Sequence, residues 1–262
     1  MLRRRLIAVA TAVAAAVLAP AAAQAHTPGK AYVALGDSYA AGVGAPPYTD
    51  PVCLRGSGGY PPLLAAKLGA TTFNYDACSG ATTADVLTSQ LGDLNRHTRL
   101  VTVTVGGNDL GFSSGLTTCL TGTDADCEAV VEQASKFTAE TLPGRLDAVY
   151  RAIRKRAPHA TIVATGYAHF FETTPDCATV PASLTKRTAL NGAVDALDAK
   201  IRQRAARAGV RFVDVRPAFT GHGLCGADPW LGGPAAQAPF HPTAIGYSDG
   251  YLPAISKALT RR

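Results

Sequence analysis

Five short runs rich in β-branched and aromatic residues, separated by stretches with helical periodicity, set the fold class of this chain. The runs are Ala31–Leu35, Thr71–Tyr75, Leu100–Val105, Thr161–Thr165 and Val210–Asp214. Strands that alternate with helices form parallel βαβ units, and these assemble into one open sheet. We therefore predict an α/β fold in which helices cover both faces of a five-stranded parallel sheet.

The helical stretches are recognised by the spacing of their apolar residues. One apolar face is formed by Leu142, Leu146, Val149 and Ile153. A second helix is predicted over Leu184–Arg207, and a third opens at Pro242-Thr243, where Pro253 is expected to bend or interrupt it. No internal repeat or low-complexity linker divides the chain, so we predict a single domain over residues 26–262.

The first 25 residues have the pattern of a secretory signal peptide. Three arginines precede an apolar stretch over Leu6–Leu18, and Ala23-Gln24-Ala25 supplies a small–x–small cleavage site. The apolar stretch is shorter than the roughly 20 residues of a spanning helix. No cysteine stands at the cleavage point for a lipid anchor. We expect a protein that is secreted into the extracellular medium.

Charge excludes some partners. The chain has a formal net charge of +6, and removal of three signal-peptide arginines from its 25 basic residues leaves +3 against 19 acidic residues. No dense basic stripe with interleaved aromatics is present, so nucleic acid is not an expected partner. We expect a monomer that makes at most transient contact with lipid interfaces. No His, Asp or Glu cluster has metal-ligand spacing, and neither a metal nor a cofactor is predicted.

The chain has an even number of cysteines, all after the cleavage site. An even count in an exported protein predicts three disulfides, although six cysteines allow about 15 pairings by count alone. None of them has the C-x-x-C spacing of a zinc or redox site. The six are Cys53, Cys78, Cys119, Cys127, Cys177 and Cys225.

Four polar signatures stand where predicted strands end or helices begin. They are Gly36-Asp37-Ser38-Tyr39, Cys78-Ser79-Gly80, Gly106-Gly107-Asn108-Asp109 and Phe240-His241-Pro242-Thr243. Each alone is weak, because Gly-Asp-Ser is also an ordinary turn and a histidine before proline is an ordinary helix entry. Their joint order is a stronger signal, because parallel strands bring their carboxyl ends to one edge of the sheet.

These residue types suit acyl transfer. A serine hydroxyl becomes a good nucleophile when a neighbouring base takes its proton, and histidine is the usual base near neutral pH. We expect Ser38 to be the nucleophile and His241 the base. The backbone N–H groups of Ser38 and Gly80 and the side-chain amide of Asn108 are the expected oxyanion donors. Asp37 is expected to bind nearby backbone N–H groups, and Asp109 to cap the helix after Asn108.

The four signatures together resemble the sequence blocks of the SGNH (GDSL) hydrolase superfamily, and the resemblance covers nearly the whole mature chain. It implies a three-layer α/β/α flavodoxin-like sandwich and carboxylic ester hydrolysis through an acyl-enzyme. The chain is most similar to secreted, three-disulfide bacterial lipases and phospholipases A1. That resemblance implies bridges between sequential cysteines, namely Cys53–Cys78, Cys119–Cys127 and Cys177–Cys225.

One departure from the family pattern concerns the base. The last block usually reads Asp-x-x-His, but Ala238 stands three residues before His241. Some secreted members orient the histidine with a backbone carbonyl, so the resemblance implies that Ala238 or Pro239 supplies one here. The rival is a triad in which Asp228 folds back to act as the acid.

Several functions fit this pattern. Lipase, phospholipase A1 and short-chain esterase are not separable from sequence, because the loops that would set acyl-chain length cannot be read. A polysaccharide deacetylase would need an aromatic-lined sugar groove, and the chain has one tryptophan, Trp230, which could equally line the acyl site or pack in the core. A non-catalytic lipid- or carbohydrate-binding module would have no need for Ser, Gly, Asn and His together.

Overall fold

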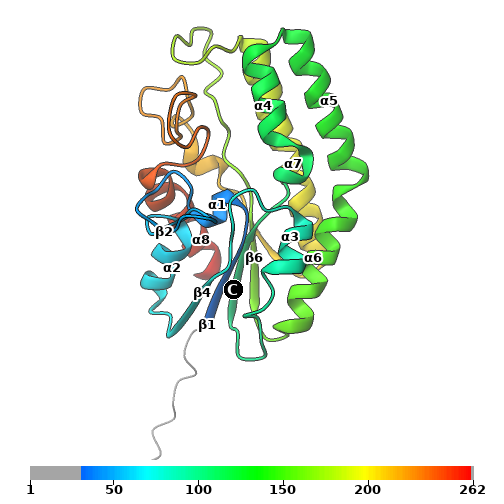
Figure 1. The fold of residues 1–262 in the computed structure, drawn as a ribbon, viewed down its shortest axis with the longest axis vertical. Helices are drawn as coiled ribbons and strands as arrows, with labels where there is room; N and C mark the ends of the chain where they lie inside the picture. The colour runs from blue at the N-terminus through cyan, green and yellow to red at the C-terminus, as the bar shows by residue number, and fades with distance from the viewer. Residues whose placement is uncertain (1–30, 261–262) are drawn as a thin grey trace, which may run out of the picture.

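The computed structural model describes residues 31–260, and a five-stranded parallel sheet lies at its centre (Figure 1). The strand order is β4-β1-β5-β6-β7, and every neighbouring pair is parallel. The predicted five-stranded α/β fold is confirmed, with all five strands at the expected places. The expected signal peptide, residues 1–25, lies outside the described residues. The strands are β1 (Ala31–Gly36), β4 (Thr72–Tyr75), β5 (Leu100–Thr104), β6 (Thr161–Thr165) and β7 (Arg211–Val213).

Helices cover the sheet on both faces and make the expected three layers (Figure 1). On one side α2 packs against β4 and α8 against β7, and on the other α3 contacts β1 and α7 contacts β6. A small hairpin of β2 (Tyr48–Asp50) and β3 (Arg55–Gly56) lies apart from the main sheet. The helices are α1 (Ser38–Ala41), α2 (Tyr60–Leu68), α3 (Thr83–Ser89), α4 (Phe112–Thr121), α5 (Asp124–Glu140), α6 (Leu142–Arg156), α7 (Leu184–Arg207) and α8 (Leu252–Thr260), with short 3₁₀ turns at Asn108–Leu110 and Arg216–Phe219.

The central strand β5 is buried at all five positions although two of them are threonines. Buried hydroxyls need hydrogen-bond partners. Thr102 bonds the Tyr32 hydroxyl at 2.7 Å, and Thr104 bonds the hydroxyls of Thr165 and Tyr60 at 2.5 and 2.9 Å. These contacts lie between neighbouring strands and the helix α2, so they fix the register of the sheet beneath the site.

The C-terminal helix is interrupted before Pro253, as the sequence predicts. Thr243 caps its start by accepting the Gly246 N–H at 3.3 Å. A π-helical turn, Gly246–Tyr251, then leads into α8. Proline has no N–H for the preceding turn and its ring crowds the carbonyl four residues earlier, and a wider π turn relieves both problems.

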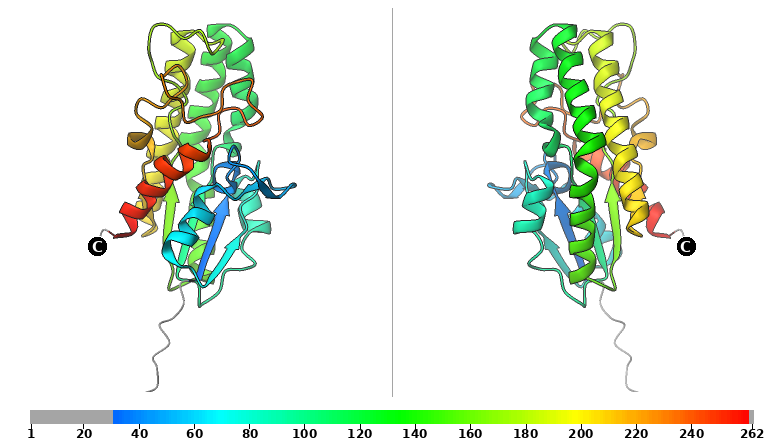
Figure 2. Two further views of the ribbon diagram at one scale, coloured as in Figure 1. Left: turned by 90° about the vertical axis from the view of Figure 1, so that its left-hand side faces the viewer. Right: turned by 90° about the vertical axis from the view of Figure 1, so that its right-hand side faces the viewer.

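The helices α4 and α5 form an antiparallel pair that extends beyond the carboxyl edge of the sheet, beside the long α7 (Figures 1 and 2). Neither α4 nor α5 was predicted from the sequence. No helix within residues 31–260 is long and apolar enough to cross a membrane.

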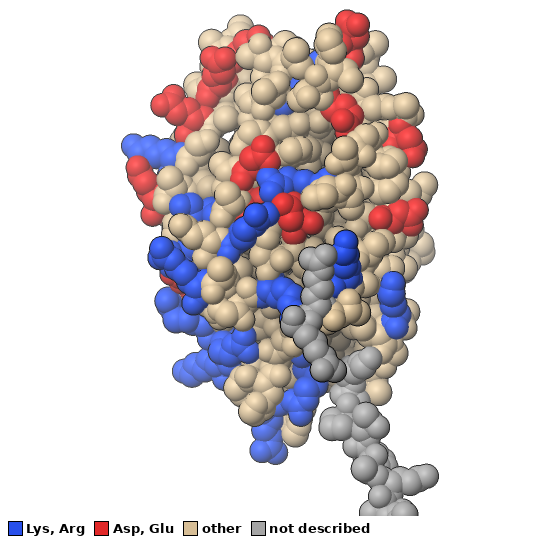
Figure 3. Space-filling view, turned by 180° about the vertical axis from the view of Figure 1, so that it is seen from behind, with Lys and Arg blue, Asp and Glu red and all other residues tan. Residues whose placement is uncertain are grey.

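Charged residues are unevenly distributed over the face seen in Figure 3. Lys and Arg gather on its lower half, toward the amino ends of the strands, and Asp and Glu are more frequent on its upper half. The positive charge visible on this face therefore lies away from the carboxyl edge of the sheet, where the predicted site residues are.

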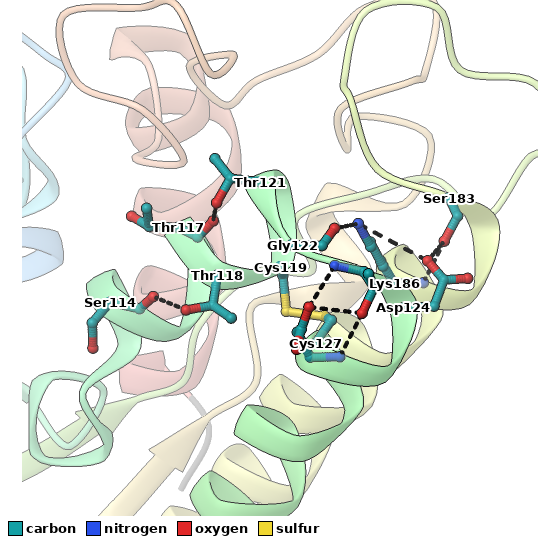
Figure 4. The surroundings of a disulfide bond; sticks show 12 residues. Ser114, Thr117, Thr118, Cys119, Thr121, Gly122, Asp124, Cys127, Ser183 and Lys186 are labelled. Atoms are coloured by element: carbon teal, nitrogen blue, oxygen red, sulfur yellow. Dashed lines mark hydrogen bonds and ion pairs between the residues drawn. A yellow bond between two sulfur atoms is a disulfide. The ribbon is translucent and has the colours of Figure 1, made fainter.

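Three disulfides join segments that follow the carboxyl ends of the strands. They join Cys53 to Cys78, Cys119 to Cys127 and Cys177 to Cys225, which is the pairing that the resemblance implies. Within residues 31–260 no cysteine is free. Figure 4 shows the Cys119–Cys127 bridge, which joins the end of α4 to the first turn of α5.

Candidate active site

The predicted site residues lie where the connections of the sheet change direction. From β1 the chain crosses to β4 on one side and then returns to β5 on the other, so a crevice opens between the carboxyl ends of β1 and β5. Ligands of doubly wound sheets bind at this kind of switch point. Ser38 follows β1 as the first residue of α1, and Asn108 follows β5.

The turn before Ser38 is held by two contacts of Gly36. Its φ is +127°, and a Cβ there would lie 2.1 Å from the Thr104 carbonyl oxygen, so only glycine fits. The Gln90 side chain accepts the Gly36 N–H at 2.7 Å and donates to the Gly36 carbonyl at 2.9 Å. The backbone that presents Ser38 is thus fixed from both sides.

Asp37 lies buried directly beneath the site. Its carboxylate accepts the Tyr39 N–H at 3.0 Å, as expected from sequence, and also the Tyr167 hydroxyl proton at 2.5 Å. The Tyr167 hydroxyl in turn accepts the Gly107 N–H at 3.2 Å. Burial raises the pKa of Asp37 to about 7, against the lowering effect of these hydrogen bonds. Asp37 and Tyr167 therefore connect the loop after β1 to the loop after β5.

Ser38 and His241 are 203 residues apart in the sequence and in direct contact in the structure. The distance from Ser38 Oγ to His241 Nε2 is 2.8 Å, and His241 Nδ1 lies 2.8 Å from the Pro239 carbonyl oxygen. A carbonyl can only accept, so Nδ1 carries the ring proton and the Nε2 lone pair faces Ser38. Burial lowers the pKa of His241 below its usual value, although the bond to Pro239 raises it.

Of the two carbonyls expected to orient the histidine, Pro239 makes the contact and Ala238 does not. The Ala238 carbonyl instead accepts the backbone N–H of His241 at 3.4 Å. The rival carboxylate, Asp228, is 73% exposed and lies with His222 and Trp230. Trp230 Nε1 donates to Asp228 at 3.2 Å, and the rings of His222 and Trp230 stack at 3.5 Å. The structure therefore does not bring Asp228 to His241.

The loop that carries His241 is fixed by its own pairing. Gly232 donates to the His241 carbonyl at 2.9 Å and accepts the Phe240 N–H at 2.7 Å. Phe240 has a φ of +60°, and its ring is buried against Phe170 and Phe171. The Tyr39 hydroxyl also donates to the Phe240 carbonyl at 2.6 Å. Tyr39, which follows Ser38, therefore fixes the position of Phe240, which precedes His241.

Each of the three predicted oxyanion donors has a hydrogen without an acceptor among residues 31–260. The N–H groups of Ser38 and Gly80 have no acceptor among residues 31–260. The Asn108 side-chain amide donates to the Ala81 carbonyl at 3.0 Å, which leaves its other amide hydrogen unused. The backbone of Gly80 has a φ of +81°, which glycine adopts without strain.

The expectation that Asp109 caps the helix after Asn108 is wrong. Its carboxylate accepts the backbone N–H of Thr83 at 2.8 Å and the Thr83 hydroxyl at 2.5 Å, and it pairs with Arg145 at 2.9 Å. Asp109 therefore binds the first turn of α3, whose orphan N–H groups attract a carboxylate. The effect is to join the loop of Gly80 to the loop of Asn108.

A pocket of about 360 Å³ opens beside Ser38 and His241. Its wall is mostly apolar: Phe112, Leu116 and Leu120 contribute one face of α4, and Val194 and Leu197 contribute part of α7. Sequence reasoning missed these residues, and it missed Gln90 and Tyr167. A signal for Tyr167 existed, because it stands two residues after a predicted strand, and Ser38 and Asn108 stand three residues after theirs. Trp230 does not line the pocket.

The comparison with known proteins gives the family. The model of the GDSL-like Lipase/Acylhydrolase family matches residues 34–248. The chain belongs to this family. It is a carboxylic ester hydrolase.

Curated relatives agree with the family match. Lipase 1 of Streptomyces coelicolor is 45% identical over 254 residues, which cover 94% of each chain. A lipase of Streptomyces rimosus is 45% identical over 231 residues, covering 87% of this chain and 86% of the relative.

Among solved structures, phospholipase A1 from Streptomyces albidoflavus NA297 superposes with a TM-score of 0.84 at 44% identity, covering 88% of this chain and 99% of that one. The extracellular lipase of Streptomyces rimosus gives 0.84 at 45% identity, with 87% and 99% covered. An acetylxylan esterase of Geobacillus stearothermophilus, at 16% identity and a TM-score of 0.57, shares the fold.

Proposed function

We propose that this chain is a secreted lipid ester hydrolase in which Ser38 is the nucleophile and His241 the general base. The observation that carries the proposal is the 2.8 Å contact between Ser38 Oγ and His241 Nε2 at the edge of an apolar pocket. A neutral imidazole with a free Nε2 lone pair is the form that takes a serine proton.

In the first half of the reaction, Ser38 Oγ attacks the ester carbonyl carbon while His241 Nε2 takes its proton. The carbonyl oxygen gains negative charge and receives hydrogen bonds from the N–H groups of Ser38 and Gly80 and from the Asn108 amide. His241 then gives its proton to the departing alkoxide oxygen, the ester C–O bond breaks, and the acyl group stays on Ser38.

In the second half, His241 takes a proton from water, and the resulting hydroxide attacks the acyl carbon. The bond to Ser38 breaks, the serine oxygen recovers the proton from His241, and the carboxylic acid leaves. Throughout, the Pro239 carbonyl accepts the Nδ1 hydrogen, so the ring keeps one orientation. Protonated His241 is stabilised by that carbonyl less strongly than a carboxylate would stabilise it.

Lipid esters are the proposed substrate class. The pocket wall formed by α4 and α7 suits an acyl chain and offers few partners for a sugar, which argues against a polysaccharide deacetylase. The relatives named lipase and phospholipase A1 are equally similar to this chain. The proposal therefore covers acyl esters of neutral glycerolipids and phospholipids, bound by a monomer that contacts the lipid surface transiently.

Secretion is supported by three observations. The chain begins with a signal-peptide pattern over residues 1–25, and a relative of 45% identity is described as an extracellular lipase. Three disulfides within residues 31–260 fit an oxidising compartment. We propose cleavage after Ala25 and release of residues 26–262, which N-terminal sequencing of the exported protein tests.

The nucleophile is tested by covalent labelling. A p-nitrophenyl alkylphosphonate should add its phosphonyl group to Ser38 with release of p-nitrophenol, visible as an intact-mass shift. Ser38→Ala should not label, and Ser113→Ala, which removes another pocket hydroxyl, should label normally. Absence of a shift in the native protein would refute the serine mechanism and leave a binding module as the alternative.

The substrate is assigned by a panel of p-nitrophenyl esters of short to long chains, a triglyceride emulsion, phosphatidylcholine vesicles and acetylated xylan. The proposal predicts hydrolysis of at least one lipid and faster cleavage of long than of short esters. Cleavage of the acetylated polysaccharide with no activity on either lipid would refute it.

A further inference from the structure

A second cavity, of about 130 Å³, shares a wall with the active-site pocket. It lies between α4, α5 and α7, which Figure 2 shows side by side above the sheet. Four residues line both spaces. These four residues are all apolar: Phe112, Leu116, Val194 and Leu197.

Most residues that line the second cavity are apolar, and its one side-chain amide belongs to Gln133, an exposed residue of α5. The outer wall of the cavity includes Val130, Val131 and Ala134 of α5. The two hydroxyls on its α4 side are already bonded to their own helix: Ser114 donates to the Gly111 carbonyl at 2.8 Å and Thr118 to the Ser114 carbonyl at 3.2 Å. A space lined mainly by apolar side chains favours an apolar guest over a polar one.

We propose that this second cavity receives the distal methylenes of a long, unbranched acyl chain. The proposal rests on the proposed function, because the acyl group joined to Ser38 would enter the first pocket. There it would run along Phe112, Leu116 and Leu120, which recur at every fourth residue on one face of α4. Rotation of the Phe112 and Leu116 side chains connects the two spaces, and the chain end passes between α4 and α7.

The turn that joins α4 to α5 is fixed by a disulfide and by hydrogen bonds, so the cavity between the helices has a defined size. The Cys119–Cys127 disulfide joins α4 to α5, and Lys186 of α7 donates to the Gly122 carbonyl in the turn between them at 2.6 Å (Figure 4). Ser183 donates to Asp124 at 2.8 Å beside it. Because the three helices are held together there, the second cavity sets an upper limit on acyl-chain length.

The test compares three esters on the exported wild type and three exported variants. Ala134→Leu fills the second cavity and does not touch the first, and Ala129→Leu adds the same side chain to an exposed position of α5. Leucine displaces about three methylenes at about fourfold each, so kcat/KM for p-nitrophenyl palmitate should fall roughly 50-fold in Ala134→Leu. For p-nitrophenyl butanoate it should not change, and Ala129→Leu should behave as the wild type on both. Val131→Ala, which enlarges the cavity, should instead favour stearate over palmitate.

The outcomes test the acyl-chain proposal and the proposed esterase function separately. If the wild type cleaves both esters and Ala134→Leu, with an unchanged Tm, keeps the wild-type ratio of palmitate to butanoate, the acyl-chain proposal fails while the esterase function stands. If the wild type cleaves neither ester, the proposed function itself fails. A crystal structure of Ser38 bearing a hexadecylphosphonyl group gives a direct readout. The tail should lie between α5 and α7, and a tail that runs over the surface past Pro234 would overturn the proposal.

Discussion

Substitution of Asp228 separates the two ways of orienting His241. In the structure the Asp228 carboxylate is 73% exposed and lies 3.2 Å from Trp230 Nε1 and 3.4 Å from His222 Nδ1. The Nδ1 hydrogen of His241 already has an acceptor at 2.8 Å in Pro239. Asp228→Asn should therefore change kcat/KM by less than about twofold, because it removes no contact of the histidine.

The rival arrangement predicts a far larger effect. Converting the acid of a working Ser-His-Asp triad to its amide lowers kcat about 10⁴-fold, which corresponds to about 5 kcal/mol of transition-state stabilisation. The assay is steady-state hydrolysis of p-nitrophenyl butanoate, with Tm as the check on folding. Asp176→Asn, which removes the same charge from another exposed loop, controls for net charge. A loss of a hundredfold or more in Asp228→Asn, with normal Tm and normal Asp176→Asn, would refute the carbonyl arrangement.

Three further predictions concern the oxyanion donors and the buried ionisable groups. Asn108→Ala should lower kcat about 10²- to 10³-fold with little change in KM, since its amide is proposed to act on charge that develops in the transition state; an unchanged kcat for ester hydrolysis would contradict this role. The acid limb of kcat/KM should have its midpoint below pH 6.5, because burial lowers the pKa of His241 and the base works deprotonated; a pH–rate profile with a midpoint above 6.5 would contradict it. Burial raises the pKa of Asp198 from 3.8 to about 7, so between these pH values the folded protein keeps a proton that the unfolded chain has lost. The free energy of unfolding therefore falls as the pH rises, until Asp198 ionises in the folded protein near pH 7. Between pH 5 and pH 8 the free energy of unfolding measured in urea should fall further in the wild type than in Asp198→Asn, by on the order of 2 kcal/mol, and equal slopes would contradict the assignment.

The strands were predictable because each is a short run rich in β-branched and aromatic residues that is bounded by turn residues. Their carboxyl ends then placed the three loop signatures at one edge. The long helix α7 was predictable from the helical spacing of four apolar residues, Leu190, Val194, Leu197 and Ile201.

The helices α4 and α5 were missed for different reasons. The sequence of α4, Phe112–Thr121, consists largely of Ser, Thr and Gly, which are weak helix formers, so packing and the disulfide at Cys119 define it. By contrast α5 begins with a capping box between Thr123 and Asp126, a local signal that sequence reasoning can use. The acyl pocket depends on α4, and for that reason the α4 residues that line it were not predictable.

The relative position of Ser38 and His241 is set mainly by the contacts that their neighbours in the sequence make. Tyr39 next to the serine bonds the carbonyl of Phe240 next to the histidine, and the buried Phe240 ring anchors that residue in the core. A histidine held on both sides in this way needs only one acceptor for Nδ1 to keep its tautomer, and the Pro239 carbonyl supplies it. A carboxylate in this place would raise the pKa of the buried imidazole, whereas a carbonyl leaves it low. The missing aspartate at position 238 is therefore consistent with a base that stays neutral, and able to accept the serine proton, at a lower pH than a triad histidine would.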